Sequence, residues 1–149
     1  MEQSICKYPA HIRQLDGRFQ CQSVADHCRQ AAKYASASLA SLNLASTGYL
    51  AGLLHDMGKY TMCFARYIEK ASRGELVIRG SVNHTFAAVV FLMERYHKKE
   101  MMDFSMMTCE ILSFVVGSHH GEFDCVDLNR DSGFEHRLDI DKESISYFE

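Results

Sequence analysis

Apolar side chains recur at helical spacing through most of this 149-residue chain, which contains a single proline and no tryptophan. Proline breaks helix interiors, so its near absence leaves long segments able to form helices. The clearest stripe has i, i+3, i+4, i+7 spacing and consists of Leu50, Leu53, Leu54 and Met57. That spacing places apolar residues on one face of an α-helix. The sequence therefore predicts an all-α fold.

Similar periodicity elsewhere predicts a helical bundle of about five to six helices, with a metal cleft at helix ends. The expected helices cover residues 22–42, 45–57, 61–72, 83–97 and 103–116. The segment 73–83 is expected to be a loop with a brief extended piece at Leu76–Ile78, and residues 117–138 are polar and loop-like. A last helix is expected from Asp141, and the sequence stops inside it. We therefore expect one domain, residues 1–149, that lacks its C-terminal helices.

Charge and composition limit the class of protein. The net charge of −3 gives no support to passive electrostatic binding of nucleic acid. No window approaches the ~18 apolar residues of a membrane span, and the N-terminus has no apolar signal segment. These features indicate a cytoplasmic protein with no membrane contact. The six cysteines have no C-x-x-C spacing and are expected to be reduced packing residues.

His55 and Asp56 stand side by side in the segment AGLLHDMGKY, residues 51–60. At about 100° per residue they lie opposite the apolar stripe. The same side of the helix carries small residues, namely Gly48, Ala51 and Gly52. Mid-helix glycine costs about 1 kcal/mol relative to alanine, so two glycines indicate that another element approaches closely. Gly58 is expected to be the C-cap of this helix. The pattern predicts a crowded polar cleft.

Most of the other relevant histidines lie at or near the ends of expected helices. His84 is expected in a first helical turn, where the helix dipole keeps an imidazole neutral, as metal binding requires. His119 and His120 directly follow the expected helix 103–116, and His27 lies on the first helix. Together with His55 and Asp56, these side chains could converge in one cleft.

Imidazoles bind borderline transition metals, and one carboxylate can bridge two of them. Two metal ions about 3.5–4 Å apart are the usual device for phosphodiester hydrolysis. A histidine-rich set favours Mn, Ni, Co, Fe or Zn over Mg, although Mg remains possible. The expected cofactors are therefore two divalent transition metal ions.

Four stretches of the sequence, in order, resemble one known family. They are AHIRQLDGRFQCQSVADHCRQAAKYA, AGLLHDMGKYTMCFARYI, VNHTFAAVVFL and SFVVGSHHGEFD. The set is similar to the HD nuclease domain of the helicase–nuclease of type I CRISPR interference, a member of the HD superfamily of metal-dependent phosphohydrolases. The similarity runs from about Tyr8 to Phe123.

The resemblance implies a helical, metal-dependent nuclease that degrades single-stranded DNA in antiviral defence. Carried over by position, it implies one metal held by His27, His55 and Asp56, and a second held by His84, His119 and His120 with Asp56 bridging. It implies that Lys59 lies near the scissile phosphate as a point charge. Single-stranded DNA, a helicase motor and a CRISPR DNA-recognition complex are the implied partners.

Two departures from the family pattern leave other functions open. The family completes its first metal site with a later aspartate, and no residue in a matching motif is found among Asp124, Asp127, Asp131, Asp139 and Asp141. The helicase motor is also missing. One alternative is an HD phosphohydrolase acting on nucleotides, and another is a metal-poor docking domain. Cap or surface roles are expected for the remaining histidines, His11, His97 and His136, and Lys59 has the alternative of an ordinary cation at a helix C-terminus.

Overall fold

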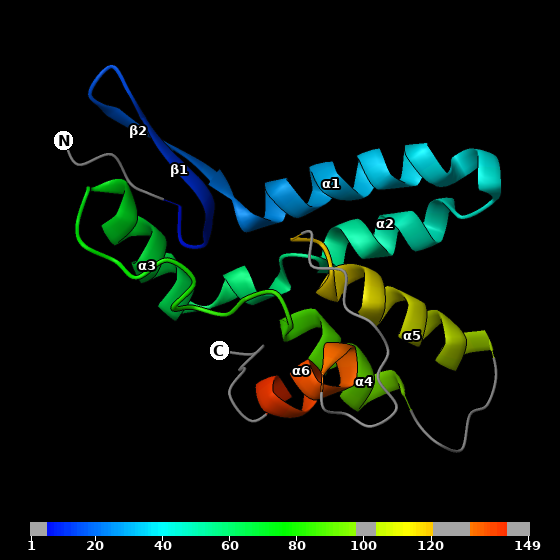
Figure 1. The fold of residues 1–149 in the computed structure, drawn as a ribbon. Helices are drawn as coiled ribbons and strands as arrows, with labels where there is room; N and C mark the ends of the chain where they lie inside the picture. The colour runs from blue at the N-terminus through cyan, green and yellow to red at the C-terminus, as the bar shows by residue number, and fades with distance from the viewer. Residues whose placement is uncertain (1–5, 98–103, 121–131, 143–149) are drawn as a thin grey trace.

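The computed structural model describes residues 6–97, 104–120 and 132–142. The chain begins with a hairpin, and six α-helices and two short 3-10 helices follow within the described residues (Figure 1). The elements are β1 (Pro9–Leu15), β2 (Arg18–Ser23), α1 (Val24–Leu39), η1 (Ala40–Leu42), α2 (Ala45–Leu54), η2 (Met57–Tyr60), α3 (Met62–Ser72), α4 (Ala87–Tyr96), α5 (Phe104–Gly117) and α6 (Gly133–Lys142). The predicted all-α bundle is confirmed. No described helix has the length and apolar character that crossing a bilayer requires.

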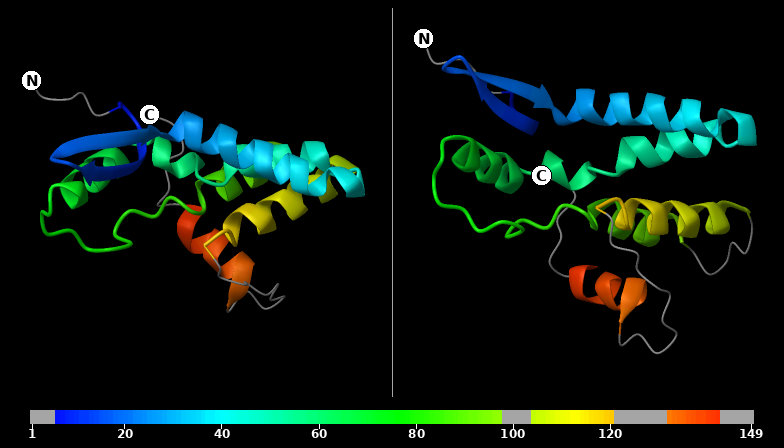
Figure 2. Two further views of the ribbon diagram at one scale, coloured as in Figure 1. Left: turned by 90° about the horizontal axis from the view of Figure 1, so that it is seen from above. Right: turned by 45° about the horizontal axis from the view of Figure 1, so that its top comes forward.

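The bundle is built from two helix pairs. Helices α1 and α2 lie side by side, and α4 lies beside α5, with α6 packed against α4 (Figures 1 and 2). The main core lies around α4, and its most buried large side chains are Phe86, Val89, Val90 and Val116. Burial of each such side chain contributes about 1.5–3 kcal/mol. This core fixes the start of α4 and the end of α5. Three predicted site residues adjoin these ends, His84 before α4 and His119 and His120 after α5.

The close approach predicted from the glycines of α2 is confirmed. A Cβ atom at Gly52 would lie 2.4 Å from the Cα atom of Ala32, and one at Gly48 would lie 2.6 Å from the carbonyl oxygen of Ala35. Both contacts are to α1. Because only glycine fits at these positions, α1 and α2 can pack backbone to backbone. This packing brings His27 of α1 close to the end of α2.

The segment around His55 departs from the sequence prediction. Helix α2 ends at Leu54 rather than Met57, so His55 is its C-cap and Asp56 precedes the short helix η2. Gly58 is not a cap. It is buried within η2, where a Cβ atom would lie 2.3 Å from the carbonyl oxygen of His84. The loop before α4 therefore crosses η2 at van der Waals contact.

Helix α4 begins at Ala87, so His84 lies in the preceding loop and not in a first helical turn. The helix-dipole argument for its neutral ring is therefore wrong. The segment around Leu76–Ile78 is a loop, as expected, and these residues form no strand; Leu76 is fully exposed. Helix α6 begins at Gly133, well before the expected start at Asp141.

The hairpin was not predicted, although the sequence contains a signal for it. Asp16 and Gly17 have φ values of +50° and +74°. An Asp-Gly pair with two positive φ angles suits the two-residue turn of a β-hairpin. The strands pair in antiparallel register, with Leu15 opposite Arg18 and Ile12 opposite Cys21. The mixed polar composition of these strands hides the alternation that usually marks them.

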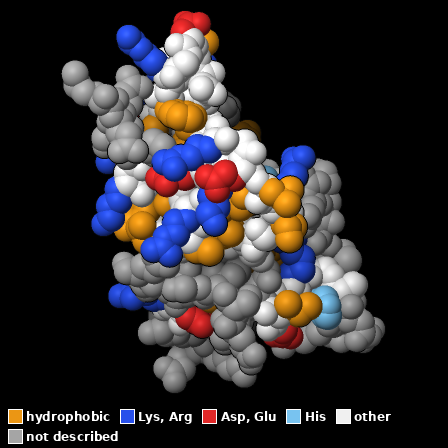
Figure 3. All heavy atoms as spheres, turned by 90° about the vertical axis from the view of Figure 1, so that its left-hand side faces the viewer, with side chains coloured by type: hydrophobic (Ala, Val, Ile, Leu, Met, Phe, Trp, Pro, Cys, Tyr) orange, Lys and Arg blue, Asp and Glu red, His pale blue; other side chains and the backbone are white. Residues whose placement is uncertain are grey.

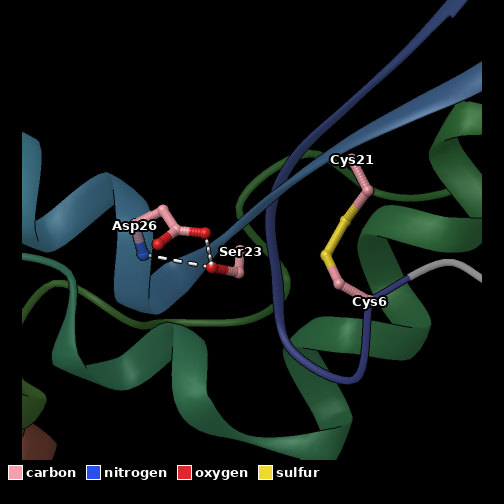
Figure 4. The surroundings of a disulfide bond; sticks show 4 residues. All are labelled: Cys6, Cys21, Ser23 and Asp26. Carbon is pink, nitrogen blue, oxygen red and sulfur yellow. Dashed lines mark hydrogen bonds between the residues drawn. A yellow bond between two sulfur atoms is a disulfide. The ribbon is translucent and has the colours of Figure 1, made fainter.

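A disulfide joins Cys6 to Cys21, with their Cα atoms 6.3 Å apart (Figure 4). The expectation that all cysteines are reduced is therefore wrong for this pair. A separation of 15 residues has no local signature, because the contact arises from the fold of the hairpin. Cys28, Cys63 and Cys109 are free thiols, and Cys125 lies outside the described residues.

Candidate metal centre

Asp56 lies at the centre of the predicted site, and its side chain is buried, with 3% exposed. Its Oδ2 atom lies 2.9 Å from His27 Nε2 and 3.1 Å from His55 Nε2. The two imidazole nitrogens are themselves 3.1 Å apart. Ligand atoms about 2.0–2.1 Å from one metal ion lie roughly 3 Å from each other. The three atoms therefore have the mutual spacing of ligands around one ion.

The other carboxylate oxygen of Asp56, Oδ1, faces a second set of histidines. It lies 3.5 Å from His119 Nε2 and 3.7 Å from His84 Nε2. His84 Nε2 in turn lies 3.0 Å from His120 Nε2. Each oxygen of one carboxylate thus faces a different histidine set, which is the arrangement a bridging ligand requires.

Backbone carbonyl oxygens orient the rings. His55 Nδ1 lies 2.8 Å from the carbonyl oxygen of Gly52, and His119 Nδ1 lies 2.5 Å from that of Val116. A carbonyl oxygen only accepts hydrogen bonds, so each Nδ1 carries the proton that it donates. In a neutral ring, Nε2 is then left with a lone pair directed at Asp56.

In this orientation the Nε2 lone pairs of His55 and His119 face the oxygens of Asp56, so hydrogen-bond acceptors face one another. Asp56 Oδ1 and His119 Nε2 are buried without a hydrogen-bond partner among the described residues. Buried polar atoms are rarely left unpaired, because the loss of hydration costs about 1–3 kcal/mol each. A cation between the lone pairs satisfies both. The nitrogen-rich donor sets fit divalent transition ions.

Burial and charge shift the protonation states on which metal binding depends. Burial raises the pKa of Asp56, but contacts with His119, His55 and Lys59 outweigh it and hold the pKa well below the usual range. Burial lowers the pKa of His84 to about 4 and also lowers that of His27. For His55 the contact with Asp56 outweighs burial and raises the pKa. An ionised carboxylate and neutral imidazoles are the forms that bind metal, so the shifts at Asp56, His84 and His27 favour binding, and at His55 a metal ion competes with a proton.

The structure brings all six predicted ligands together in two groups that share Asp56. One group is His27, His55 and Asp56, and the other is Asp56, His84, His119 and His120. They come from α1, the end of α2, the loop before α4 and the turn after α5. Their role as ligands stays a prediction. The first group has three members among the described residues, and Asp139 of α6 is exposed and outside it.

Lys59 lies in η2 with its Nζ atom 2.8 Å from Asp56 Oδ2, and its side chain is 8% exposed. It is therefore a buried partner of the carboxylate rather than an exposed cation at a helix end. His97 pairs with Glu110 at 2.8 Å, away from the cluster, and His136 lies on α6.

The sequence predicts a cap or surface role for His11, and the structure places this exposed histidine beside the site. Its ring on β1 lies 4.7 Å from the ring of His27, centroid to centroid. Burial lowers its pKa. His11 reaches the site because it lies on the hairpin, which was not predicted. The Asp16-Gly17 turn signal is the sequence feature that would have indicated the hairpin.

Three cavities help to locate the chemistry. Two have mainly apolar walls and hold none of the clustered histidines: one lies among α4, α5 and α6, and the other among α2, α4 and α5. A third, of about 530 Å³, is polar and is bordered by His84 and His120. Only this third cavity of those three opens next to the predicted ligands.

Comparison with protein families places the whole cluster within a known domain. Residues 15–144 match the family described as Cas3, HD domain. The matched range includes all six residues of the two groups, and His11 lies just outside it. Comparison with curated proteins gives no match.

Proposed function

The chain belongs to the family of Cas3 HD domains, which makes it a metal-dependent nuclease of CRISPR interference, and we propose that its substrate is single-stranded DNA. The observation that carries the proposal is the position of Asp56, whose two oxygens face two histidine groups. Two ions sharing one carboxylate suit phosphodiester hydrolysis. We propose Asp56 as the bridging ligand of such a pair.

The proposed ligands are His27, His55 and Asp56 for one ion, and Asp56, His84, His119 and His120 for the other. When bound, such ions supply positive charge for the phosphate oxygens and lower the pKa of water. Manganese, nickel, cobalt, iron or zinc fits the nitrogen-rich set.

The protein's own residues prepare this chemistry. The backbone carbonyl oxygens of Gly52 and Val116 hold the rings of His55 and His119 with Nε2 directed inward. The rings then need no reorientation to bind metal, which is how outer contacts tune a metal site. Lys59 keeps an ammonium 2.8 Å from Asp56, where it is a point charge for an approaching phosphate.

The net charge of −3 bears on how the substrate arrives. A protein with this charge gains little from general attraction to DNA. We propose that a helicase motor and a CRISPR DNA-recognition complex deliver the strand.

Degradation of circular single-stranded DNA tests the substrate. The assay compares manganese, nickel and EDTA, and it includes Asp56→Asn, His84→Ala and a control, His97→Ala, whose ring pairs with Glu110 outside the cluster. We expect metal-dependent loss of the circle in the wild type and the control, and none in the two site variants. A circle that survives with every metal refutes the proposal.

A parallel assay with nucleotides separates the competing enzyme class. Rapid hydrolysis of nucleotides without loss of the DNA circle identifies a nucleotide phosphohydrolase instead. Failure of both reactions, with metal bound, identifies a docking domain.

A further inference from the structure

We propose that the polar cavity beside the second histidine group binds a backbone phosphate of the DNA strand, next to the phosphate that is cleaved. The inference rests on the proposed function, because it names how the same site holds its substrate. The cavity measures about 530 Å³, within the ~300–1,000 Å³ range of ligand sites. Its walls include Tyr67, Arg79, Asn83, His84, His120 and Arg137.

The charge of this cavity contrasts with the charge of the chain. Two arginines, Arg79 and Arg137, line it, and no described Asp or Glu does. The chain as a whole carries a net charge of −3. A local concentration of positive charge in an acidic chain indicates an anionic ligand. The donors of a guanidinium group match the geometry of phosphate oxygens.

Arg137 is held in place by the core. Its neighbours on α6, Phe134 and Leu138, are buried in the core cluster. The guanidinium carbon lies 4.1 Å from the centre of the Phe86 ring, a cation–π contact. Phe86 follows His84 by two residues, so the charge of Arg137 is fixed on the wall that leads to the second histidine group.

Arg79 is placed by a tight turn. The backbone N–H of Ser81 donates to the carbonyl oxygen of Ile78 at 3.1 Å, and Gly80 has a φ of +80°. A turn with positive φ at its third position favours glycine there. Arg79 is therefore the second residue of a defined turn. Gly80 also lines the cavity and adds no side chain to fill it.

One wall of the cavity belongs to a helix that carries further basic residues. Tyr67 belongs to α3, which also carries Arg66 and Lys70. Figure 3 shows Lys and Arg side chains gathered on the side where the hairpin and α3 lie in Figure 1, with fewer Asp and Glu between them. Because His84 and His120 belong to both the cavity and the second group, a strand lying there meets the proposed metals directly.

Binding of a labelled oligothymidine by the whole chain in EDTA, at about 50 mM salt, tests the cavity without cleavage. The test variant is Arg79→Gln/Arg137→Gln. The control, Arg29→Gln/Lys33→Gln, removes the same charge from exposed positions of α1. We expect the test variant to raise Kd at least about tenfold, and the control less than about twofold. The salt slope should fall by about 0.7 for one lost phosphate contact.

Two further arms identify the ligand as phosphate and exclude misfolding. An oligothymidine with an uncharged methylphosphonate backbone should bind the wild type and the test variant equally weakly. Arg79→Lys/Arg137→Lys keeps the charge but loses the fork of donors, so its Kd should fall between those of the wild type and the glutamine variant. Manganese binding should be unchanged in both variants, because no proposed ligand is altered.

Equal losses in the test and control variants would overturn the proposal, as would a loss that persists with the uncharged backbone. Absence of wild-type binding in EDTA would also overturn it. The proposed function fails separately, if manganese-dependent cleavage of single-stranded DNA is absent.

Discussion

Replacement of Gly58 by alanine is expected to displace His84 and weaken the second metal site selectively. The added Cβ atom would lie 2.3 Å from the carbonyl oxygen of His84 and 2.6 Å from its Cα atom, whereas ordinary contacts begin at 3.4 Å. The loop before α4 must therefore move by about 1 Å. Metal ligands tolerate deviations of only about 0.2 Å.

From this displacement we expect manganese affinity at the second site to fall about 10- to 100-fold, the range seen when support for a ligand is lost. The first site should keep its affinity, because the atoms nearest to the added Cβ all belong to His84, which is not in the first group. Overpacking of this kind costs about 1–3 kcal/mol of unfolding free energy.

Isothermal titration with manganese, alongside urea unfolding in EDTA, measures both effects. Gly48→Ala is the matched control, since its Cβ atom would lie 2.6 Å from the backbone of α1 at Ala35, away from the cluster. It should lose comparable stability and retain the affinity of the second site, whose histidines lie outside α1 and α2. Two unchanged manganese affinities in Gly58→Ala would refute the reasoning.

Three other changes give distinct results. Asp56→Asn leaves the Lys59 ammonium buried without its counter-charge, so urea unfolding in EDTA should show a loss of about 3–5 kcal/mol in unfolding free energy. Arg29→Gln, in the exposed pair with Asp26, should lose less than about 1 kcal/mol. Equal losses in the two variants would contradict a buried pair of Lys59 and Asp56. His27→Ala and His84→Ala should each bind one ion per chain by elemental analysis, and loss of both ions from either variant would show that the groups are not separate sites. Burial raises the pKa of Cys28 to about 11. At pH 8, iodoacetamide should therefore label the exposed Cys63 first, and Cys28 should react appreciably only as the pH approaches that pKa. Equal labelling of the two cysteines at pH 8, measured by peptide mass spectrometry, would show that Cys28 is not buried.

The helical class and the composition of the cluster were both predicted from the sequence, the first from local patterns and the second from resemblance to a family. Apolar periodicity identifies helices such as α3 and α5 to within a few residues. The two glycines of α2 predicted close packing because glycine has a cost that only such packing offsets. The members of the cluster were identified by resemblance to a family. The distances between them come from the structure, because apolar periodicity gives no information about contacts between helices.

The rest depended on contacts between distant residues. Helix α2 ends at Leu54, ahead of the place where the loop carrying His84 crosses Gly58, a contact between residues 26 positions apart that no local pattern encodes. Helix α6 forms at residues that are mostly polar, and Phe134 and Leu138 hold it against Phe86 and Phe114. The hairpin and its Cys6–Cys21 disulfide also depend on pairing across strands.

The central claim is that one carboxylate, Asp56, joins two metal ions, and electron paramagnetic resonance of the manganese-loaded chain tests it most directly. Two ions about 3.5–4 Å apart that share a carboxylate should give the spectrum of a magnetically coupled pair. The account predicts that coupled spectrum at two manganese ions per chain. An isolated-ion spectrum at every manganese ratio would contradict it.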